Sequence, residues 1–294
     1  MSTQTSLRND LAGELFQNAR DFLNQALWFL LKDDSSQRVA KFTVVNLQMS
    51  VELLVKWYLV DRQGVEDIFD KDFATSLDQR ADIWSGRLKT LRYEACKHRF
   101  IRLRAIDRPA RKLLDDFQKQ RNRIVHSFLT LSYNECISSA ADFVFNVIRH
   151  FFSEHDGQFG KFLDKDIYNR LITFEPYVEK ATAKARGADA DEILTCWNCR
   201  NETLIHLDDE FHCFACGIVG NERASPYTPC PFCGKKAFVY DGLNISHFTV
   251  RGECMVCGRD GMMEKCVDCG NIVCTEIEGD YGLDGKWRCD ACAT

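Results

Sequence analysis

The chain has 294 residues, of which 45% are hydrophobic and 28% charged, and its formal net charge is −5 at pH 7. Such a length can form two domains with buried cores. The first residues lack the basic and then apolar pattern of a signal peptide, and no stretch is long and apolar enough to cross a bilayer. We therefore expect a cytoplasmic protein that has no membrane segment.

Amphipathic helices are expected in the first part of the chain, because apolar residues recur there every three or four positions. One such pattern covers 11–29, and a second covers 42–57 after the cap-like sequence Asp33-Asp34-Ser35-Ser36. The pattern predicts that one face of the second helix is buried, made of Phe42, Val45, Met49, Leu53 and Trp57. The less regular stretch 61–87 predicts short helices and loops.

Three further helices are expected before residue 190. Asp107 and Pro109 begin a long one that reaches about residue 128, since proline is tolerated in a first turn. A stripe of Ile137, Ala141, Val144, Ile148 and Phe151 predicts the next over 133–152, and the third covers 166–186. Residues 1–180 are therefore predicted to form an all-α antiparallel bundle of four or five main helices.

The pattern changes beyond a small, charged segment at 181–192, which we interpret as a linker. Short β-type runs follow at 203–207, 237–240 and 245–251, and Asp241-Gly242 predicts a hairpin-like turn between the last two. Residues 193–294 are therefore predicted to form two or three tandem, β-rich zinc ribbons.

Six Cys-x-x-Cys pairs carry the clearest chemical signal in this region. A pair of thiolates three positions apart can hold one metal ion from a tight turn, and two pairs complete a four-thiolate shell. Their regular spacing favours reduced, metal-bound thiolates over disulfides. The pairs are Cys196 and Cys199, Cys213 and Cys216, Cys230 and Cys233, Cys254 and Cys257, Cys266 and Cys269, and Cys289 and Cys292.

Pairing these motifs in order predicts about three structural zinc ions with closed shells. The order is not settled by spacing, because thirteen residues separate Cys216 from Cys230 just as they separate Cys199 from Cys213. Four other residues could each replace one of these thiolates as a metal ligand, namely Cys274, His206, His212 and His247. A role in a strand or at the surface is the simpler interpretation for all four. Cys96 and Cys136 stand alone and are expected to be plain buried thiols.

Charge is divided unevenly along the chain. Residues 191–294 contain 9 Lys and Arg against 17 Asp and Glu, a net of −8, whereas residues 1–190 have 29 against 26, a net of +3. An acidic zinc region is a poor surface for a phosphate backbone. Residues 86–123, by contrast, contain 13 Lys and Arg and only 4 Asp and Glu, and such a run attracts polyanions.

Arg121, Asn122 and His126 lie late in the long helix that begins near Asp107. At about 100° per residue, Asn122 and His126 fall opposite the apolar arc of that helix, and Arg121 falls on its flank. A solvated polar face would explain such residues in an arbitrary helix. In this helix they follow the basic run, which favours a site for a negatively charged ligand.

This motif and its setting resemble the HEPN superfamily, helical domains found in many prokaryotic toxins, phage-defence proteins and RNA-processing enzymes. The resemblance covers roughly 11–152. It depends on Arg121-Asn122-x-x-x-His126 and on the run Val51-Glu52-Leu53-Leu54-Val55-Lys56, which is similar to a run in the family's second helix. It implies a metal-independent endoribonuclease that works as a homodimer, with the two motif helices facing one cleft.

The resemblance also implies a role for each motif residue. His126 would be a general base or acid at the ribose 2′-hydroxyl and the leaving oxygen, since imidazole commonly titrates near neutral pH. Arg121 would hold the scissile phosphate, and Asn122 would orient the phosphate or the imidazole. The products would carry a 2′,3′-cyclic phosphate and a 5′-hydroxyl. Glu52 would either position the motif or form a structural ion pair.

One departure from the family concerns regulation. Members that a nucleotidyltransferase partner silences often carry Tyr two residues after the motif His, and here that position is Phe128, which has no hydroxyl. The zinc ribbons then become the candidate for control or for recognition of a partner or trigger. The implied role is a toxin, an antiviral defence protein or a stress-response ribonuclease that binds RNA.

Two other functions fit the same sequence. In the first, the protein is a non-catalytic adaptor whose helical bundle dimerises and whose acidic ribbons bind protein. In the second, it is a DNA-binding regulator that uses the ribbons, with a local basic patch near Lys235 and Lys236. The charge of −8 in residues 191–294 argues against this second function.

Overall fold

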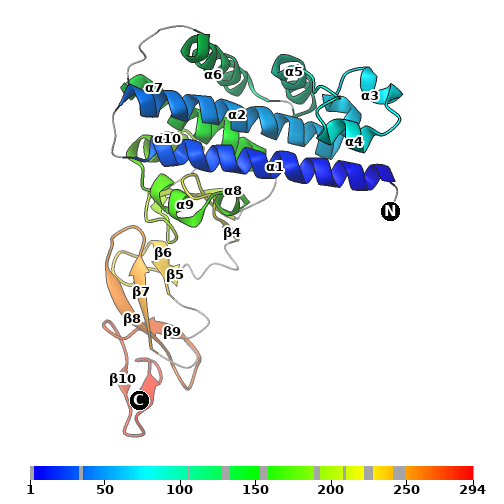
Figure 1. Cartoon of the computed structure of the whole chain (residues 1–294). Coiled ribbons are helices and arrows are strands. Elements are labelled where there is room, and N and C mark those ends of the chain that lie inside the picture. The colour runs from blue at the N-terminus through cyan, green and yellow to red at the C-terminus, as the bar shows by residue number, and fades with distance from the viewer. Residues whose placement is uncertain are drawn as a thin grey trace. The chain divides into compact units, whose positions relative to one another are not determined.

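The computed structural model describes residues 3–32, 36–104, 106–126, 133–152, 158–188, 193–207, 210–221, 228–240 and 249–293. The chain divides into two compact units, Met1–Lys180 and Ala181–Thr294. The first unit is helical, and the second contains short antiparallel strands with the cysteine groups (Figure 1). No helix of the described residues combines the length and apolarity that a membrane crossing requires.

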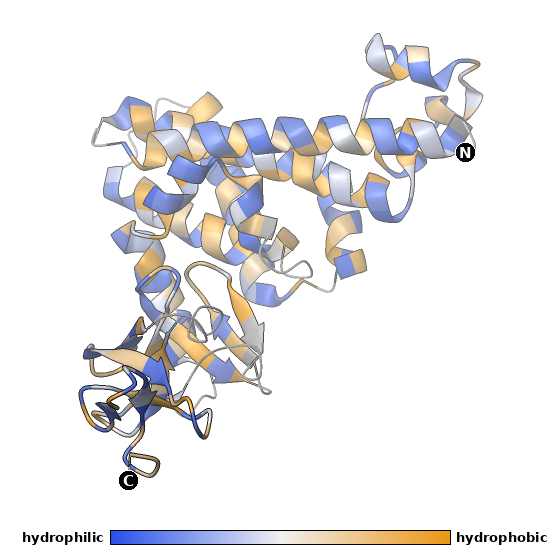
Figure 2. Cartoon of the chain, turned by 90° about the horizontal axis from the view of Figure 1, so that it is seen from below, coloured by the Kyte–Doolittle hydropathy of each residue, from blue (hydrophilic) through white to orange (hydrophobic). Residues whose placement is uncertain are grey.

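Two long helices, α1 (Thr3–Leu30) and α2 (Gln37–Arg62), form the centre of the first unit and lie side by side (Figure 1). Ser36 caps α2 by accepting a hydrogen bond from the Val39 backbone N–H. Apolar and polar residues are interspersed along α1, the long helix that begins at the N-terminus (Figure 2). Ser50 of α2 donates to the Ala19 carbonyl at 2.8 Å, which requires close contact between the two backbones.

The prediction of which face of α2 is buried is wrong. Phe42 is exposed, and the other four residues of that stripe are only partly buried. The completely buried apolar positions are Val44, Leu47, Val51, Leu54, Val55, Leu59 and Val60. The reason is that α2 packs against α1 and also against α5 (Tyr93–Arg104), α6 (Arg108–His126) and α7 (Tyr133–Phe143). A helix covered on several sides has no single apolar stripe.

The elements around α2 agree in part with the predicted pattern. The stretch after α2 holds short elements, namely η1 (Val65–Ile68), α3 (Asp72–Thr75) and α4 (Gln79–Trp84). The α7 helix continues through a π-helical turn, η2 (Val144–Ile148), and a 3-10 turn, η3 (Arg149–Phe152), and its expected stripe is buried. The α5 helix was not expected, because only four of its twelve residues are buried and most of the others are charged or small.

The single helix expected over 166–186 is in fact two helices. These are α9 (Lys165–Leu171) and α10 (Glu175–Arg186), which follow the short α8 (Gln158–Phe162). Pro176 explains the break, since it has no N–H to bond the carbonyl of Ile172. The α10 helix also continues through the first residues of the expected linker, where Ala181 and Ala185 are buried.

Beyond the end of α10, two sheets and a hairpin make up the described part of the second unit. The first sheet has the order β1 (Ile193–Thr195), β2 (Glu202–Leu207), β3 (Glu210–Cys213) and β4 (Val219–Asn221). The second has the order β5 (Thr228–Pro229), β6 (Lys236–Val239), β7 (Val250–Cys254), β8 (Asp260–Lys265) and β9 (Ile272–Cys274). The hairpin pairs β10 (Asp280–Tyr281) with β11 (Trp287–Arg288).

These strands agree with the expected ribbons where they can be compared. The expected runs at 203–207 and 237–240 correspond to β2 and β6, and β6 pairs with β7 as the predicted hairpin requires. The expected turn at Asp241-Gly242 and most of the run 245–251 lie outside the described residues. Because β8 and β9 flank the Cys266 pair, the third cysteine group continues directly from the second sheet.

Candidate metal centres and candidate catalytic helix

The first cysteine group joins the turn after β1 to the turn after β3. The Sγ atoms of Cys196 and Cys216 are 3.7 Å apart, and those of Cys199 and Cys213 are also 3.7 Å apart. Three of the four thiols are buried. Thr203 Oγ1 lies 3.2 Å from Cys213 Sγ, so a hydroxyl of β2 contacts this ligand from outside the group.

The second and third groups have the same construction. In the second, the separations are 3.8 Å between Cys230 and Cys257 and 3.7 Å between Cys233 and Cys254. In the third, which also contains Cys266 and Cys292, the sulfurs of Cys269 and Cys289 lie 3.6 Å apart. The buried Trp287 packs against Cys266 and Cys289 and forms the small core of this module.

These distances fit zinc. Within each group all four sulfur atoms lie within 4.8 Å of one another. Zinc–sulfur bonds of about 2.3 Å in a tetrahedron place the sulfurs about 3.8 Å apart, whereas disulfide sulfurs are about 2.05 Å apart. All fifteen cysteines belong to the described residues, and each is a free thiol there. The pairs thus combine in chain order into three four-thiolate shells with no position for a substrate, as expected for about three structural zinc ions.

Backbone N–H groups of the turns bond to several of the cysteine sulfurs. Backbone N–H groups of Phe232 and Val256 donate to the sulfurs of Cys230 and Cys254, each at 3.4 Å. Similar bonds, first from the N–H of Cys269, lower the pKa of Cys266 to about 6. The thiolate is the form that binds zinc, so the backbone favours the binding form of Cys266. Burial outweighs the backbone bonds at Cys254 and raises the pKa of that thiol to about 12.

The remaining ligand candidates are not part of these groups. Cys274, His206 and His212 belong to none of the three groups within the described residues, and His247 lies outside those residues. Burial raises the pKa of the Cys274 thiol above its ordinary value. Cys96 and Cys136 are buried in the first unit, and burial raises their thiol pKa values as well.

One of the turns departs from the others in its backbone. The residue after the second cysteine adopts a left-handed conformation as Gly217, Gly234, Gly258 and Gly270, with φ between 70° and 76°. In the first module this position is Arg200, at φ 62°. A side chain there costs about 1–2 kcal/mol relative to glycine. Arg200 Nη1 reaches Glu253 at 2.7 Å and the sulfur of Met255 at 3.6 Å, so it joins the first sheet to the second.

The expected catalytic residues all lie in the last two turns of α6. Asp107 begins this helix by accepting a hydrogen bond from the Ala110 N–H at 2.8 Å. Leu114 and Phe117 are buried, whereas Asn122 and His126 are exposed. Arg121 is half-buried beside the packed face, and its Nη1 donates to Asn122 Oδ1 at 2.9 Å. Phe128 lies outside the described residues.

Lys97 of α5 attaches that helix to α6 and was missed at the level of sequence. Its side chain is 2% exposed, and its Nζ bonds Asp115 at 2.6 Å and Gln118 at 2.9 Å, both on α6. Glu94 of α5 accepts a third bond at 2.7 Å. Lysine is almost never buried without partners, and the sequence does not show which residues will be its partners in the fold. Nothing in the basic run therefore distinguished Lys97 from the exposed cations around it.

Glu52 in the second family-like run forms an ion pair along α2. Its Oε1 accepts a bond from Lys56 Nζ at 3.0 Å, and Lys56 also reaches Thr90 Oγ1 at 3.1 Å. Both side chains are largely buried. Burial, helped by the nearby Glu52 charge, raises the pKa of Tyr93 well above its ordinary value. This part of the run holds α2 to the segment before α5.

Most cations of the basic run, residues 86–123, form no ion pair within the described residues. Within the described residues, four of its thirteen cations form ion pairs, namely Arg87, Lys97, Arg99 and Lys119. Seven others are exposed and have no acidic partner among the described residues: Lys89, Arg92, Arg102, Arg108, Arg111, Lys112 and Arg123. The last four belong to α6, the helix that also bears the exposed His126. The α6 surface can therefore attract an anion.

Comparisons of the chain with models of protein families, with curated proteins and with solved structures found no match.

Proposed function

We propose that the protein is a metal-independent endoribonuclease of the HEPN type, in which α6 carries the catalytic groups and zinc supports the second unit. The observation that carries the proposal is the exposed pair Asn122 and His126, one helical turn apart, with the Arg121 guanidinium bonded to Asn122 at 2.9 Å. A base or acid, an amide and a cation on one surface are the groups that cleavage through a 2′-hydroxyl needs.

Each group has a defined task in this reaction. His126 removes the proton of the 2′-hydroxyl, which attacks the adjacent phosphorus, and an imidazolium returns a proton to the departing 5′-oxygen. Arg121 stabilises the charge that accumulates on the phosphoryl oxygens. Asn122 orients the guanidinium, to which it is already bonded. The reaction yields a 2′,3′-cyclic phosphate and a 5′-hydroxyl without any water or metal ion in the cleavage step.

One chain offers only one exposed His on α6, although the two proton transfers occur on opposite sides of the phosphorus. A homodimer with two facing α6 helices would supply both groups, as in the family that the sequence resembles. Exposed Arg108, Lys112 and Arg123 on α6 would then draw RNA to the shared cleft. Light scattering should show a dimer, and a strict monomer that cleaves RNA would contradict this arrangement.

The biological setting follows from the same proposal. A ribonuclease of this type in a bacterium acts as a toxin or in antiviral defence or stress response. The three zinc modules, with their acidic surface, would recognise a protein partner or trigger that controls cleavage. Expression in cells tests this role: growth should stop with the wild type and continue with His126→Ala.

A substrate lacking the attacking group tests the chemistry. RNA and an otherwise identical 2′-O-methyl oligonucleotide are incubated with the zinc-loaded protein in magnesium-free buffer. The proposal predicts cleavage of the RNA alone, with cyclic phosphate and 5′-hydroxyl ends. Cleavage of the methylated strand, or products with 5′-phosphate ends, would overturn it.

A further inference from the structure

A cavity of about 550 Å³ lies in the second unit, where the first and second sheets meet. This size is within the range of roughly 300–1,000 Å³ found for small-molecule sites. None of the zinc ligands lines it. Its walls come from both modules and include Trp197, Arg200, Val239, Tyr240, Arg251 and Met255.

The apolar part of the cavity suits a flat ring. Trp197 and Tyr240 offer aromatic faces, and Val239 and Met255 add aliphatic and thioether surface. The edge-on contact of Trp197 with Phe211, at 6.2 Å between ring centroids, supports the indole from within the first module. Proteins hold unpaired nucleobases by stacking them on such aromatic side chains.

Two guanidinium groups lie at the rim. Arg200 pairs with Glu253 at 2.7 Å, and Arg251 pairs with Asp260 at 2.5 Å. The two arginine side chains are 58% and 73% exposed, so these ion pairs contribute little to stability. An incoming phosphate can therefore replace a carboxylate, since the guanidinium fork binds phosphate oxygens two at a time.

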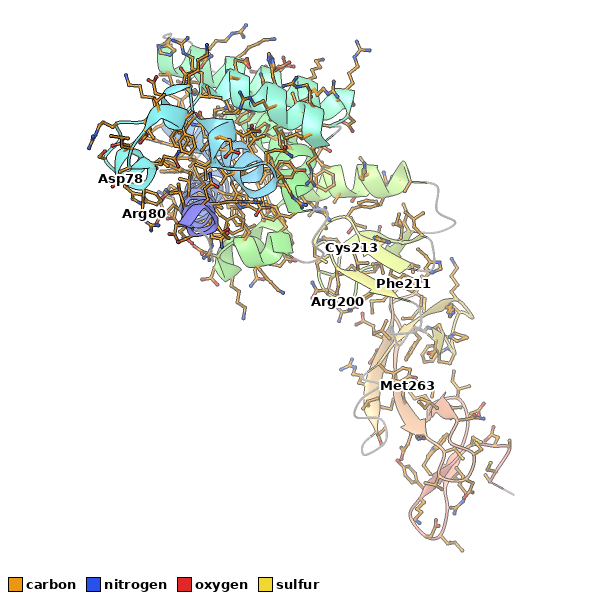
Figure 3. All side chains as sticks on the ribbon, turned by 90° about the vertical axis from the view of Figure 1, so that its right-hand side faces the viewer. Asp78, Arg80, Arg200, Phe211, Cys213 and Met263 are labelled. Carbon is orange, nitrogen blue, oxygen red and sulfur yellow. The ribbon has the colours of Figure 1, made fainter. Side chains whose placement is uncertain are left out.

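The left-handed backbone conformation of Arg200 indicates that the arginine side chain has a role that glycine could not fill. Four equivalent turns place glycine at this left-handed position, and glycine would fit here without strain. The chain instead retains a long cation there, at the edge of the cavity. Figure 3 labels Arg200 together with Phe211 and Cys213 of the same module.

We propose that this cavity binds a nucleotide, with the base against Trp197 and Tyr240 and the phosphate on Arg200 and Arg251. The site lies in the zinc-bearing unit and needs no cleavage chemistry, so the inference goes beyond the proposed ribonuclease activity. The net charge of −8 over residues 191–294 disfavours a long phosphate backbone. The ligand is a single nucleotide, either free or unpaired within an RNA.

Calorimetry with the zinc-loaded full chain tests the proposal. The probes are the four ribonucleoside 5′-monophosphates and a single-stranded 2′-O-methyl octanucleotide, which lacks the hydroxyl needed for cleavage. Arg200→Gly and Tyr240→Ala should each weaken binding at least about tenfold. Arg259→Ser removes an exposed cation of the same unit outside the cavity, and it should change binding less than about twofold. Glycine suits the Arg200 backbone, so that variant should keep its zinc and its melting temperature.

The outcomes distinguish a free nucleotide from a nucleotide within RNA, and they distinguish nucleotide binding by the cavity from the proposed ribonuclease activity. Binding of a monophosphate that Arg200→Gly weakens identifies a free nucleotide, and binding of the octanucleotide alone that Arg200→Gly weakens identifies RNA at the cavity. Octanucleotide bound to the basic α6 surface would bind this variant as it binds the wild type. No binding of either probe, an equal loss in Arg259→Ser, or binding that Arg200→Gly and Tyr240→Ala leave unchanged would overturn the inference. His126→Ala should bind like the wild type, so failed cleavage and failed nucleotide binding are distinguishable.

Discussion

Lys97 Nζ lies 2.6 Å from Asp115 Oδ1, and this buried contact fixes α5 against α6, the helix that bears Arg121, Asn122 and His126. The lysine side chain is 2% exposed, whereas that of Asp115 is half exposed. The ammonium group is thus the member of the pair that depends on its partners, because a buried charge without compensation is costly.

Removing the carbon stem and charge of Lys97 should destabilise the first unit. Lys97→Ala leaves a cavity where the buried stem lay, whereas Glu94 and Asp115 are about half exposed and regain water. We expect a loss of about 2–3 kcal/mol in the free energy of unfolding, measured by urea denaturation. Lys97→Met fills the space without a charge and should recover most of that loss. Lys119→Met is the matched control, because its pair with Asp116 spans 3.6 Å on the surface; a similar loss there would contradict this role of Lys97.

The chain should bind three zinc ions through twelve of its cysteines. Cys289→Ser breaks the third group, and mass spectrometry of the metal content should then find two ions, since a neutral hydroxyl is a poor zinc ligand. Cys274→Ala is the control, because Cys274 is buried outside all three groups. A fall to two ions in Cys274→Ala would show that this thiol is a ligand.

Zinc should leave the three groups in a definite order. Three of the four thiols of the first group are buried, but Cys233 and Cys257 of the second group are exposed. A chelator reaches an exposed sulfur more easily, so zinc release followed with a metal-sensitive dye should be biphasic. Cys213→Ser should remove the slow phase, and Cys233→Ser should remove part of the fast phase. Release in one phase would contradict the difference in burial.

Gly252 should be irreplaceable in the second sheet. A Cβ atom at this position would lie 2.2 Å from the Phe238 ring, which is completely buried. Gly252→Ala should therefore lower the free energy of unfolding of the second unit by about 1–3 kcal/mol, as other overpacked cores do. Gly13→Ala is the control, because nothing lies within 4 Å of that Cβ on α1. This control should be neutral or slightly stabilising in thermal melts.

The sequence predicted best those features that depend on local spacing. The sequence predicted the cysteine pairs but left their order open; they combine in chain order because antiparallel strands between paired motifs, such as β2 with β3 and β6 with β7, return the chain to its starting point. Helix α6 and the run through α7, η2 and η3 follow from a cap with Pro109 and from a strong apolar stripe. Exposure of Asn122 and His126 followed from helical periodicity alone.

Features that depend on tertiary contacts were not predictable in this way. The burial of α2 depends on neighbours that arrive far along the chain, so its partly buried stripe gave no guide to the core. Lys97 is one lysine in a basic run until α6 supplies Asp115 and Gln118. One sequence feature marks the cavity between the two sheets: Arg200 occupies a position that is Gly in four other Cys-x-x-Cys turns.

The central claim is catalysis by α6, and single-turnover cleavage of a labelled RNA in magnesium-free buffer tests it most directly. His126→Ala should slow cleavage by about 100-fold to 10,000-fold, and Arg121→Ala should slow it by about 100-fold or more. The controls are His98→Ala on α5 and Arg170→Ala on α9, which remove an exposed imidazole and an exposed guanidinium outside α6. The account predicts near wild-type cleavage by both controls. Equal cleavage by His126→Ala, Arg121→Ala and the wild type would contradict it.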